Sequence, residues 1–233
     1  MNNELKWVRE SDFGTWFLST DTWVNFVLRK ALDDLEHLFP ERKPSYQKIM
    51  DVGCGFGHSL VELDKRFDPQ QLIGLDVDPD VPARAQINAD QCHAKVEFLT
   101  SNAEAIALPD ASLDMIFCHQ TFHHIVGQEQ AVKEFYRLLK PGGVLLFAES
   151  CRRFIHSLII KVLFRHPMDV QKTAEEYVDL LQQTGFQIKP EQISHPYLWW
   201  SRWDLGVLEK MGLVNPKKPH EETMVNVIAV KPD

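Results

Sequence analysis

The chain has 233 residues, 44% of them hydrophobic, and its 25 Lys and Arg against 33 Asp and Glu leave a net charge of −8. That length is enough for one domain with a sizeable core. The acidic balance argues against non-specific nucleic-acid binding, which depends on phosphate neutralisation by Lys and Arg. The four cysteines have no paired metal-type spacing, so we expect reduced thiols in a cytoplasmic protein. We expect no signal peptide, and no apolar run reaches the roughly 20 residues that span a bilayer.

The first predicted element is an amphipathic helix over residues 21–38, which Pro40 stops. Its apolar residues recur at helical spacing: Trp23, Phe26, Val27, Ala31, Leu32, Leu35 and Leu38. This helix lies ahead of the most informative part of the chain.

A buried strand over residues 48–52 runs into three alternating glycines. Gly53, Gly55 and Gly57 follow Asp51, and a helix is expected from residue 57. Glycines let bare backbone approach a ligand closely, and the first turn of a helix presents free N–H groups. The dinucleotide fingerprint Gly-x-Gly-x-x-Gly places its third glycine one residue further on. The spacing therefore favours a different nucleotide-like ligand.

A second buried strand over residues 71–76 ends in Asp76. A carboxylate about 20 residues beyond the glycines, at the tip of the second strand, suits both hydroxyls of a ribose. The alternative is that Asp76 is a helix N-cap or an ordinary loop acid.

Strands and helices continue to alternate along the rest of the chain. We expect helix 80–92, strand 95–99, strand 113–118, helix 128–139, strand 143–149, a helix opened by the capping box 173–176 and closed by Gly185, strand 186–188 and strand 224–230. This alternation predicts an α/β fold with a doubly wound sheet and right-handed crossovers. Ligands bind such sheets at the carboxyl ends of the strands, where Asp51, Asp76, Asn102 and His119 all fall.

Three further motifs accompany the glycine turn and the acidic strand end: Ser101-Asn102-Ala103-Glu104, the Leu-Pro-Asp-Ala-Ser-Leu-Asp run into the strand that ends at Cys118, and residues 135–146 around Lys140-Pro141-Gly142-Gly143. With these five motifs in this order, the chain resembles the class I S-adenosylmethionine-dependent methyltransferases. Within that family it looks most like the small-molecule branch that includes the quinone-biosynthesis enzymes. The resemblance covers residues 46–150 well and the flanks poorly.

The resemblance implies a Rossmann-like, seven-stranded, mostly parallel sheet whose last strand inserts antiparallel beside the fifth. We accordingly expect a single methyltransferase domain over residues 1–233. Its parts would be a helical N-terminal cap (1–45), a cofactor-binding core (46–150), and a segment that adds a cap (151–172) and completes the sheet (151–233).

The resemblance also assigns a cofactor site. S-adenosylmethionine, with S-adenosylhomocysteine as product, would be held by Asp51, Gly53, Cys54, Gly55, Gly57, Asp76, Val77, Asn102, Ala103, His119, Gln120 and His124. Asp51 would act on the ammonium end and Asp76 on the ribose hydroxyls. Asn102 stands where the family usually has Asp, and its carbonyl can still accept a hydrogen bond from the adenine amino group. The backbone N–H of Ala103 would face the adenine ring.

The segment 119–124 contains three histidines and follows the fourth strand, between the expected cofactor and its acceptor. Methyl transfer needs a base only where the acceptor must lose a proton, and His119 and His123 are the candidate general bases. For His124 we favour packing or a cofactor contact. We expect no metal ion, because no neighbouring carboxylate spacing completes a histidine site.

The variable ends are expected to choose the acceptor. Aromatic residues in both ends would wall an apolar pocket, form a dimer surface or simply pack in the core: Phe13, Trp16, Phe17, Tyr197, Trp199, Trp200 and Trp203. Residues 152–165 read as a basic amphipathic helix that would cap the site, touch a membrane surface or pack in the core. No Asn- or Asp-Pro-Pro-Tyr motif, typical of enzymes that methylate amino groups of bases, follows the fourth strand.

The sequence therefore predicts methyl transfer to a small, apolar or aromatic molecule by a monomer or homodimer, with no nucleic-acid partner and at most weak membrane-surface contact. The histidines favour O- or C-methylation, and N-methylation stays open. Two other functions stay open as well: a non-catalytic protein that binds S-adenosylmethionine, and an NAD-dependent oxidoreductase. A titration with NAD separates the last from the others.

Overall fold

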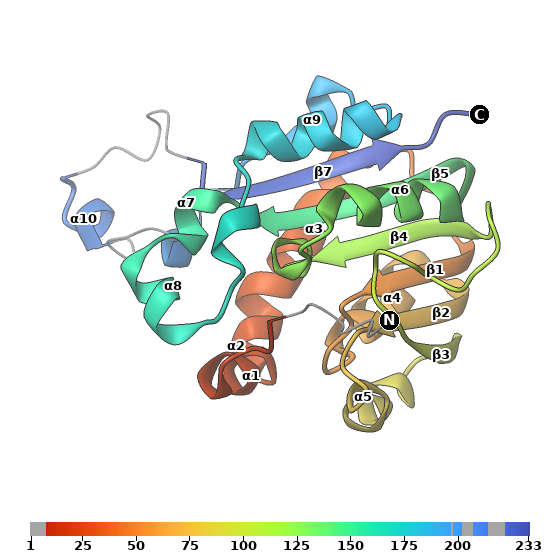
Figure 1. Cartoon of the computed structure of the whole chain (residues 1–233), viewed down its shortest axis with the longest axis horizontal. Helices are drawn as coiled ribbons and strands as arrows, with labels where there is room; N and C mark the ends of the chain where they lie inside the picture. The colour runs from red at the N-terminus through yellow and green to blue at the C-terminus, as the bar shows by residue number, and fades with distance from the viewer. Residues whose placement is uncertain (1–7, 197, 202–206, 214–221) are drawn as a thin grey trace, which may run out of the picture.

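The computed structural model describes residues 8–196, 198–201, 207–213 and 222–233. The first strands in the chain pair in parallel: β1 (Tyr46–Val52), β2 (Pro69–Asp76), β3 (Lys95–Thr100), β4 (Leu113–His119) and β5 (Leu139–Ser150). The short β6 (Ile193–Ser194) and β7 (Met224–Val230) complete a 7-stranded sheet in the order β3-β2-β1-β4-β5-β7-β6 (Figure 1). β7 is antiparallel to β5, which confirms the predicted fold and its antiparallel last strand.

Helices precede the first strand, connect successive strands and follow the carboxyl end of β5. They are α1 (Asp12–Leu18), α2 (Asp21–Trp23), the π-helical turn η1 (Val24–Leu28), α3 (Arg29–Leu38), α4 (His58–Phe67), α5 (Val81–Ala89), α6 (Gln128–Leu138), α7 (Arg152–Ile155), α8 (Leu158–Leu163), α9 (Ala174–Thr184) and α10 (Val207–Lys210). Short 3-10 turns are η2 (Phe122–His124), η3 (Met168–Val170), η4 (Pro190–Gln192) and η5 (Trp199–Ser201).

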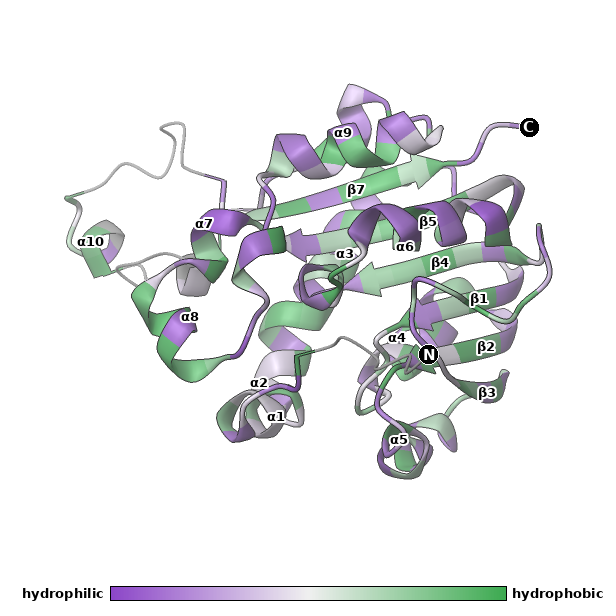
Figure 2. Ribbon diagram, viewed as in Figure 1, coloured by the Kyte–Doolittle hydropathy of each residue, from purple (hydrophilic) through white to green (hydrophobic). Residues whose placement is uncertain are grey.

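Side chains that alternate along the strands form two cores, one on each face of the sheet. On β4, Ile116 and Cys118 belong to one core, whereas Met115 and Phe117 belong to the other. Helices α6 and α9 cover the first core, and α3, α4 and α5 cover the second. In Figure 2 the strands are largely hydrophobic, while α6 and α9 show hydrophilic stretches on their outer sides.

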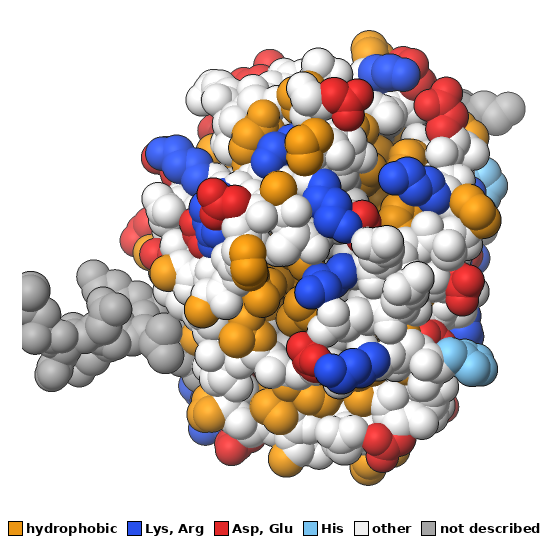
Figure 3. Space-filling model, turned by 90° about the vertical axis from the view of Figure 1, so that its right-hand side faces the viewer, with side chains coloured by type: hydrophobic (Ala, Val, Ile, Leu, Met, Phe, Trp, Pro, Cys, Tyr) orange, Lys and Arg blue, Asp and Glu red, His pale blue; other side chains and the backbone are white. Residues whose placement is uncertain are grey.

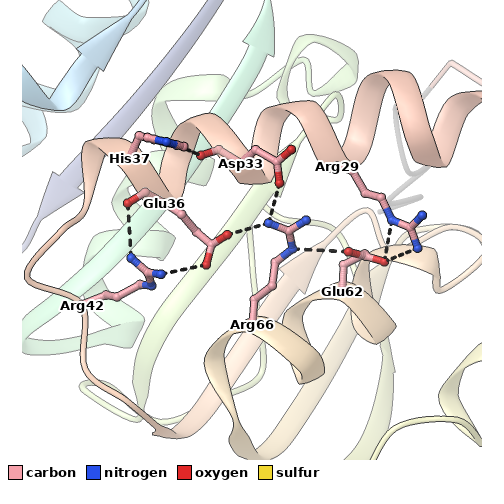
Figure 4. Close-up of polar contacts among 7 residues, drawn as sticks. All are labelled: Arg29, Asp33, Glu36, His37, Arg42, Glu62 and Arg66. Carbon is pink, nitrogen blue, oxygen red and sulfur yellow. Dashed lines mark hydrogen bonds and ion pairs between the residues drawn. The ribbon is translucent and has the colours of Figure 1, made fainter.

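An ion-pair network fastens α3 to α4 (Figure 4). The Arg66 guanidinium on α4 lies 2.8 Å from Asp33 and 2.6 Å from Glu36, both on α3. Glu62 on α4 in turn lies 2.8 Å from Arg29 on α3. Because α3 continues directly from α2 and η1, the network also fixes the segment that carries Trp23.

Two predicted elements differ from the structure. Residues 186–188 do not form a strand: Gln187 makes only an isolated bridge to Val230, and the edge strand is β6 instead. The pairing stops because Pro190, which has no N–H to donate, begins η4. The single helix expected over 152–165 is two helices, because Ser157 adopts an extended conformation and its hydroxyl caps Ile160 N–H at the start of α8.

The end of the molecule where the parallel strands begin shows side chains of both charge signs interspersed (Figure 3). A cavity of about 740 Å³ lies at this end, lined in part by Tyr46, Asp114 and Lys140, and it contains none of the predicted site residues. Within the described residues, no helix is both long and apolar enough to cross a membrane.

Candidate cofactor and acceptor site

Two adjoining cavities, of about 90 and about 210 Å³, lie over the carboxyl ends of β1, β2 and β4. The residues that line both are Val8, Gly53, Asp76, Val77, Thr121 and His124. Every residue predicted to bind the cofactor, with the exception of Gly57, lines one or both of these cavities. The fold thus brings together side chains that the sequence spreads over residues 51–124.

Two positions of the glycine turn, Gly53 and Gly57, require glycine for different structural reasons. Gly53 has φ +74°, and a Cβ there would lie 2.2 Å from Thr121 Oγ1. Gly57 has φ +77°, and a Cβ there would lie 3.0 Å from the carbonyl oxygen of Ala85 on α5. Gly53 therefore lets the turn pass close to the segment after β4, whereas Gly57 packs the start of α4 against α5, away from the cavities.

Asp76 is held at the tip of β2 by two backbone donors. Gly55 N–H donates to Oδ2 at 3.1 Å, and Asp78 N–H donates to Oδ1 at 3.1 Å. Burial raises the pKa of this carboxyl above its ordinary value. Since each carboxylate oxygen can accept a second hydrogen bond, the group is oriented to receive a pair of hydroxyls.

Asp51 is the most deeply buried acid of the cavities. Burial raises its pKa to about 7; the Ser59 hydroxyl, which donates to it, opposes that shift, and the Asp76 carboxylate adds to it. A cationic group brought beside Asp51 would favour its charged form. The site is therefore suited to an ammonium group.

Asn102 and Ala103 line the smaller cavity. The Asn102 side-chain oxygen already accepts the backbone N–H of Glu104 at 3.0 Å. One lone pair of that oxygen is left for a ligand, so the predicted contact to an adenine amino group stays a prediction.

His119 ends β4 and faces the larger of the two cavities. Its ring stacks on Phe117 with centroids 5.7 Å apart and lies 5.6 Å from the ring of Trp23. The buried Nε2 atom has no hydrogen-bond partner among the described residues. Burial, and to a smaller extent His123, lowers the pKa of His119 to about 3, so the ring is neutral and a weak proton acceptor.

His123 lies apart from the cofactor cavities. Its Nδ1 is 2.6 Å from Oε2 of Glu149, a residue of β5 that is completely buried. The two candidate bases therefore face different spaces, His119 toward the cofactor cavities and His123 toward a third cavity.

That third cavity measures about 450 Å³ and has a mostly apolar wall. Its aromatic lining is Phe13, Phe17, Trp23, Phe26, Phe154, Phe164 and Trp200, joined by Ile155, Ile159, Ile160 and Leu163. It shares Glu10, Leu18, Trp23, Gln120 and His124 with the larger cofactor cavity. The two spaces therefore adjoin each other at Trp23 and His124.

Of the aromatic residues predicted to wall a pocket, Phe13, Phe17 and Trp200 do line it, whereas Trp16 is 60% exposed. Tyr197 and Trp203 lie outside the described residues, and so does the side chain of Trp199. Sequence reasoning missed Glu10 and His166, which no motif marks. It also placed Trp23 in a helix without assigning it to a site.

The chain is similar in sequence and in fold to known methyltransferases. A model described as a methyltransferase domain matches residues 50–147. Phosphoethanolamine N-methyltransferase 1 of Arabidopsis thaliana is 32% identical over 146 residues, which are 61% of this chain and 27% of that protein. Demethylmenaquinone methyltransferase of Thermus thermophilus is 31% identical over 121 residues, 52% of each chain. The chain thus spans between a quarter and about half of the length of these relatives.

Among solved structures, a SAM-dependent methyltransferase from Aquifex aeolicus superposes with a TM-score of 0.63. The match covers 93% of this chain and 96% of that one at 18% identity, which shows a shared fold.

Proposed function

Because the chain belongs to the class I S-adenosylmethionine-dependent methyltransferases, we propose that it transfers a methyl group from S-adenosylmethionine to a small apolar or aromatic acceptor. The observation that carries this proposal is that the apolar cavity adjoins the cavity lined by Asp51 and Asp76 and shares wall residues with it. A methyl donor in the latter would present its sulfonium toward Trp23 and His124, where the acceptor space begins.

The cofactor would be held by groups that are already oriented. Asp76 would accept hydrogen bonds from the ribose hydroxyls while Gly55 and Asp78 N–H groups keep its carboxylate in place. Asp51 would pair with the ammonium group. The positive charge of that group favours ionisation of an acid whose pKa burial raises to about 7.

Methyl transfer from a sulfonium is an in-line displacement, so the protein mainly has to align and desolvate the two reactants. Such positioning lowers a barrier by roughly 7–11 kcal/mol. The Trp23 ring, which lines both spaces, would help to exclude water from the transfer path. For O- or C-methylation, the unpartnered Nε2 of His119 is available to a hydrogen bond from the acceptor, but a pKa lowered to about 3 makes this ring a poor general base.

The acceptor chemistry follows from what lines the apolar cavity. Among the described residues, its lining includes no Lys or Arg. A phosphorylated acceptor, such as the one in the name of the Arabidopsis relative, needs cationic partners to offset the cost of desolvation. An uncharged acceptor with an aromatic or alkyl body fits this lining better.

The cofactor half of the proposal is tested by calorimetric titration of S-adenosylmethionine, S-adenosylhomocysteine and NAD. We expect binding of the two sulfur ligands and none of NAD. Asp76→Asn should weaken binding by about 10- to 100-fold, the equivalent of a charged hydrogen bond. Asp80→Asn is the matched control, because Asp80 is an exposed acid just after the same strand. Equal affinity of both variants would contradict the assigned role of Asp76.

The acceptor half is tested by S-adenosylhomocysteine formation over a panel of phenols, hydroquinones, fatty acids and amines. For an accepted compound, Ile160→Ala should raise KM by roughly 5- to 30-fold through lost apolar contact. Leu158→Ala should not, since Leu158 is 82% exposed on the same helix. Cofactor binding without turnover on the whole panel would instead favour a non-catalytic binding protein.

A further inference from the structure

Three histidines from two distant segments meet in the wall of the apolar cavity. His123 and His124 belong to η2, whereas His166 lies in the loop after α8. One ring nitrogen of each lies within 4.8 Å of the others. We propose that these three imidazoles bind a divalent transition-metal ion of the zinc type.

Glu149 sets the orientation of the first imidazole. A carboxylate only accepts, so the 2.6 Å contact requires His123 Nδ1–H as the donor and leaves the lone pair on Nε2. Histidines that bind metals are commonly held in this way, with the second ring nitrogen donating to a carboxylate. Because the other Glu149 oxygen accepts the N–H groups of Thr121 and Phe122, at 2.8 and 2.7 Å, the carboxylate itself is fixed.

The loop that carries His166 is fastened to the turn that carries the other two rings. The buried Gln171 amide donates to the carbonyl oxygen of His123 at 2.8 Å and to that of Pro167 at 2.7 Å. On the other side, Arg165 N–H donates to Glu10 at 3.0 Å. Residues on either side of His166 are therefore held, so the three rings meet in a defined arrangement.

The three imidazole rings lie close together. Their centroids are 4.4 Å apart for His123 and His124, 5.0 Å for His123 and His166, and 4.7 Å for His124 and His166. The Glu10 carboxylate, 3.8 Å from His124 Nε2, adds negative charge next to the cluster.

The ligand set indicates which metals fit. Imidazoles suit zinc, copper, iron and nickel, whereas magnesium and calcium prefer oxygen ligands. At zinc–nitrogen distances of about 2.0–2.1 Å, tetrahedral ligands lie roughly 3.4 Å apart, so the nitrogen atoms must approach one another by up to about 1.4 Å. Three protein ligands leave one coordination position open, as in catalytic zinc sites. If the proposed function holds, an acceptor oxygen in the apolar cavity would take that position.

Neighbouring residues in the sequence gave no reason to expect a metal. His166 and Glu149 are far from the His123-His124 pair along the chain, and only the parallel pairing of β4 and β5 and the return of the loop after α8 bring them together.

Titration of the metal-free full chain with Co²⁺ tests this proposal without cofactor or acceptor, so a failure of methyl transfer would not affect it. We expect one equivalent to bind with the intense visible bands of a four- or five-coordinate site and to be displaced by Zn²⁺ but not Mg²⁺. His166→Ala should weaken binding at least 100-fold. His156→Ala should not, since it removes an exposed histidine from the same segment.

Glu149→Gln is the second variant and leaves all three imidazoles in place. Its amide can donate to Nδ1 and so move the ring proton to Nε2, which should weaken Co²⁺ binding about 10- to 100-fold. Circular dichroism would establish that each variant is folded. Absence of a stoichiometric Co²⁺ spectrum in the wild type would overturn the proposal, and so would equal affinity of folded His166→Ala and His156→Ala.

Discussion

The Nδ1 atom of His123 lies 2.6 Å from Oε2 of Glu149, and the two side chains are only 4% and 0% exposed. The same carboxylate accepts the backbone N–H groups of Thr121 and Phe122 through its other oxygen. A single acid near the end of β5 thus determines the shape of the turn after β4. That turn separates the cofactor cavities from the apolar cavity.

Replacing this acid should be costly. Glu149→Ala leaves two backbone N–H groups and one imidazole N–H without their acceptor, so we expect the free energy of unfolding to fall by about 3–5 kcal/mol. Glu149→Gln should lose less, because an amide oxygen can still accept the backbone donors. Urea unfolding followed by circular dichroism measures both against Glu175→Ala, an exposed acid on α9. A loss in Glu149→Ala no larger than in Glu175→Ala would contradict the structural role of this acid.

Gly53→Ala should impair both stability and cofactor binding. The substitution puts a side chain at φ +74° and places its Cβ 2.2 Å from Thr121 Oγ1. Gly212→Ala is a matched control, because Gly212 has φ +68° with nothing within 4 Å of the added Cβ. The control should lose about 1–2 kcal/mol from the left-handed backbone alone. Gly53→Ala should lose more, and calorimetry should find its cofactor affinity reduced while that of the control is unchanged.

Arg66 should stabilise the fold through the ion pairs that link α4 to α3. Its side chain is 18% exposed and its guanidinium lies within 3 Å of carboxylates on α3, so Arg66→Gln should lower the free energy of unfolding by about 1–2 kcal/mol. Lys65→Gln, an exposed neighbour on the same helix, should change it by less than about 0.5 kcal/mol. In urea unfolding at high salt, the difference in unfolding free energy between wild type and Arg66→Gln should become smaller, because screening weakens these ion pairs. A difference that is insensitive to salt would point to packing of the side chain instead.

The sequence predicted those parts of the fold that depend on local pattern. The continuous apolar run of β4 and the glycine turn after β1 are properties of neighbouring residues. The sheet, and the cluster of Asp51, Asp76 and His119 at its carboxyl edge, therefore follow from local pattern. The capping box of α9 was also correct, because the Thr173 and Glu176 bonds lie within one turn.

What the sequence did not show depends on tertiary contact. The predicted strand over residues 186–188 did not form, and β6 is the edge strand instead. Pairing with β7, and not β-propensity, decides where an edge strand forms. Likewise, Ser157 divides the predicted 152–165 helix through a local cap that periodicity does not reveal. His166 and Glu149 join the candidate site only through the packing of β5 and the loop after α8.

Asp51 should make the stability of the ligand-free protein depend on pH. Burial raises its pKa from an ordinary value of 3.8 to about 7, so the folded state keeps this proton at pH values where the unfolded chain has released it. Stability should therefore fall as the pH rises from about 4 to 7 and level off above that. The side chain introduced by Asp51→Asn is uncharged at every pH. The free energy of unfolding of this variant should therefore exceed that of wild type by a margin that grows from pH 4 to 7, to at most about 4 kcal/mol. Urea unfolding at pH 5 and pH 8 measures that margin, and an equal margin at both values would mean that the pKa is not raised.

Cofactor binding should respond to the same group in the opposite direction. The ammonium of S-adenosylmethionine pairs with the charged form of Asp51, so wild-type affinity should weaken as the pH falls below about 7, where the empty site is protonated. Asp51→Asn should bind more weakly than wild type at pH 8 by roughly 10-fold or more, and the difference should shrink at pH 6. Calorimetric titration at both pH values checks this, with Asp80→Asn as the control. A variant that is more stable but binds its cofactor less well would show that this acid is retained for the ligand at the expense of the fold.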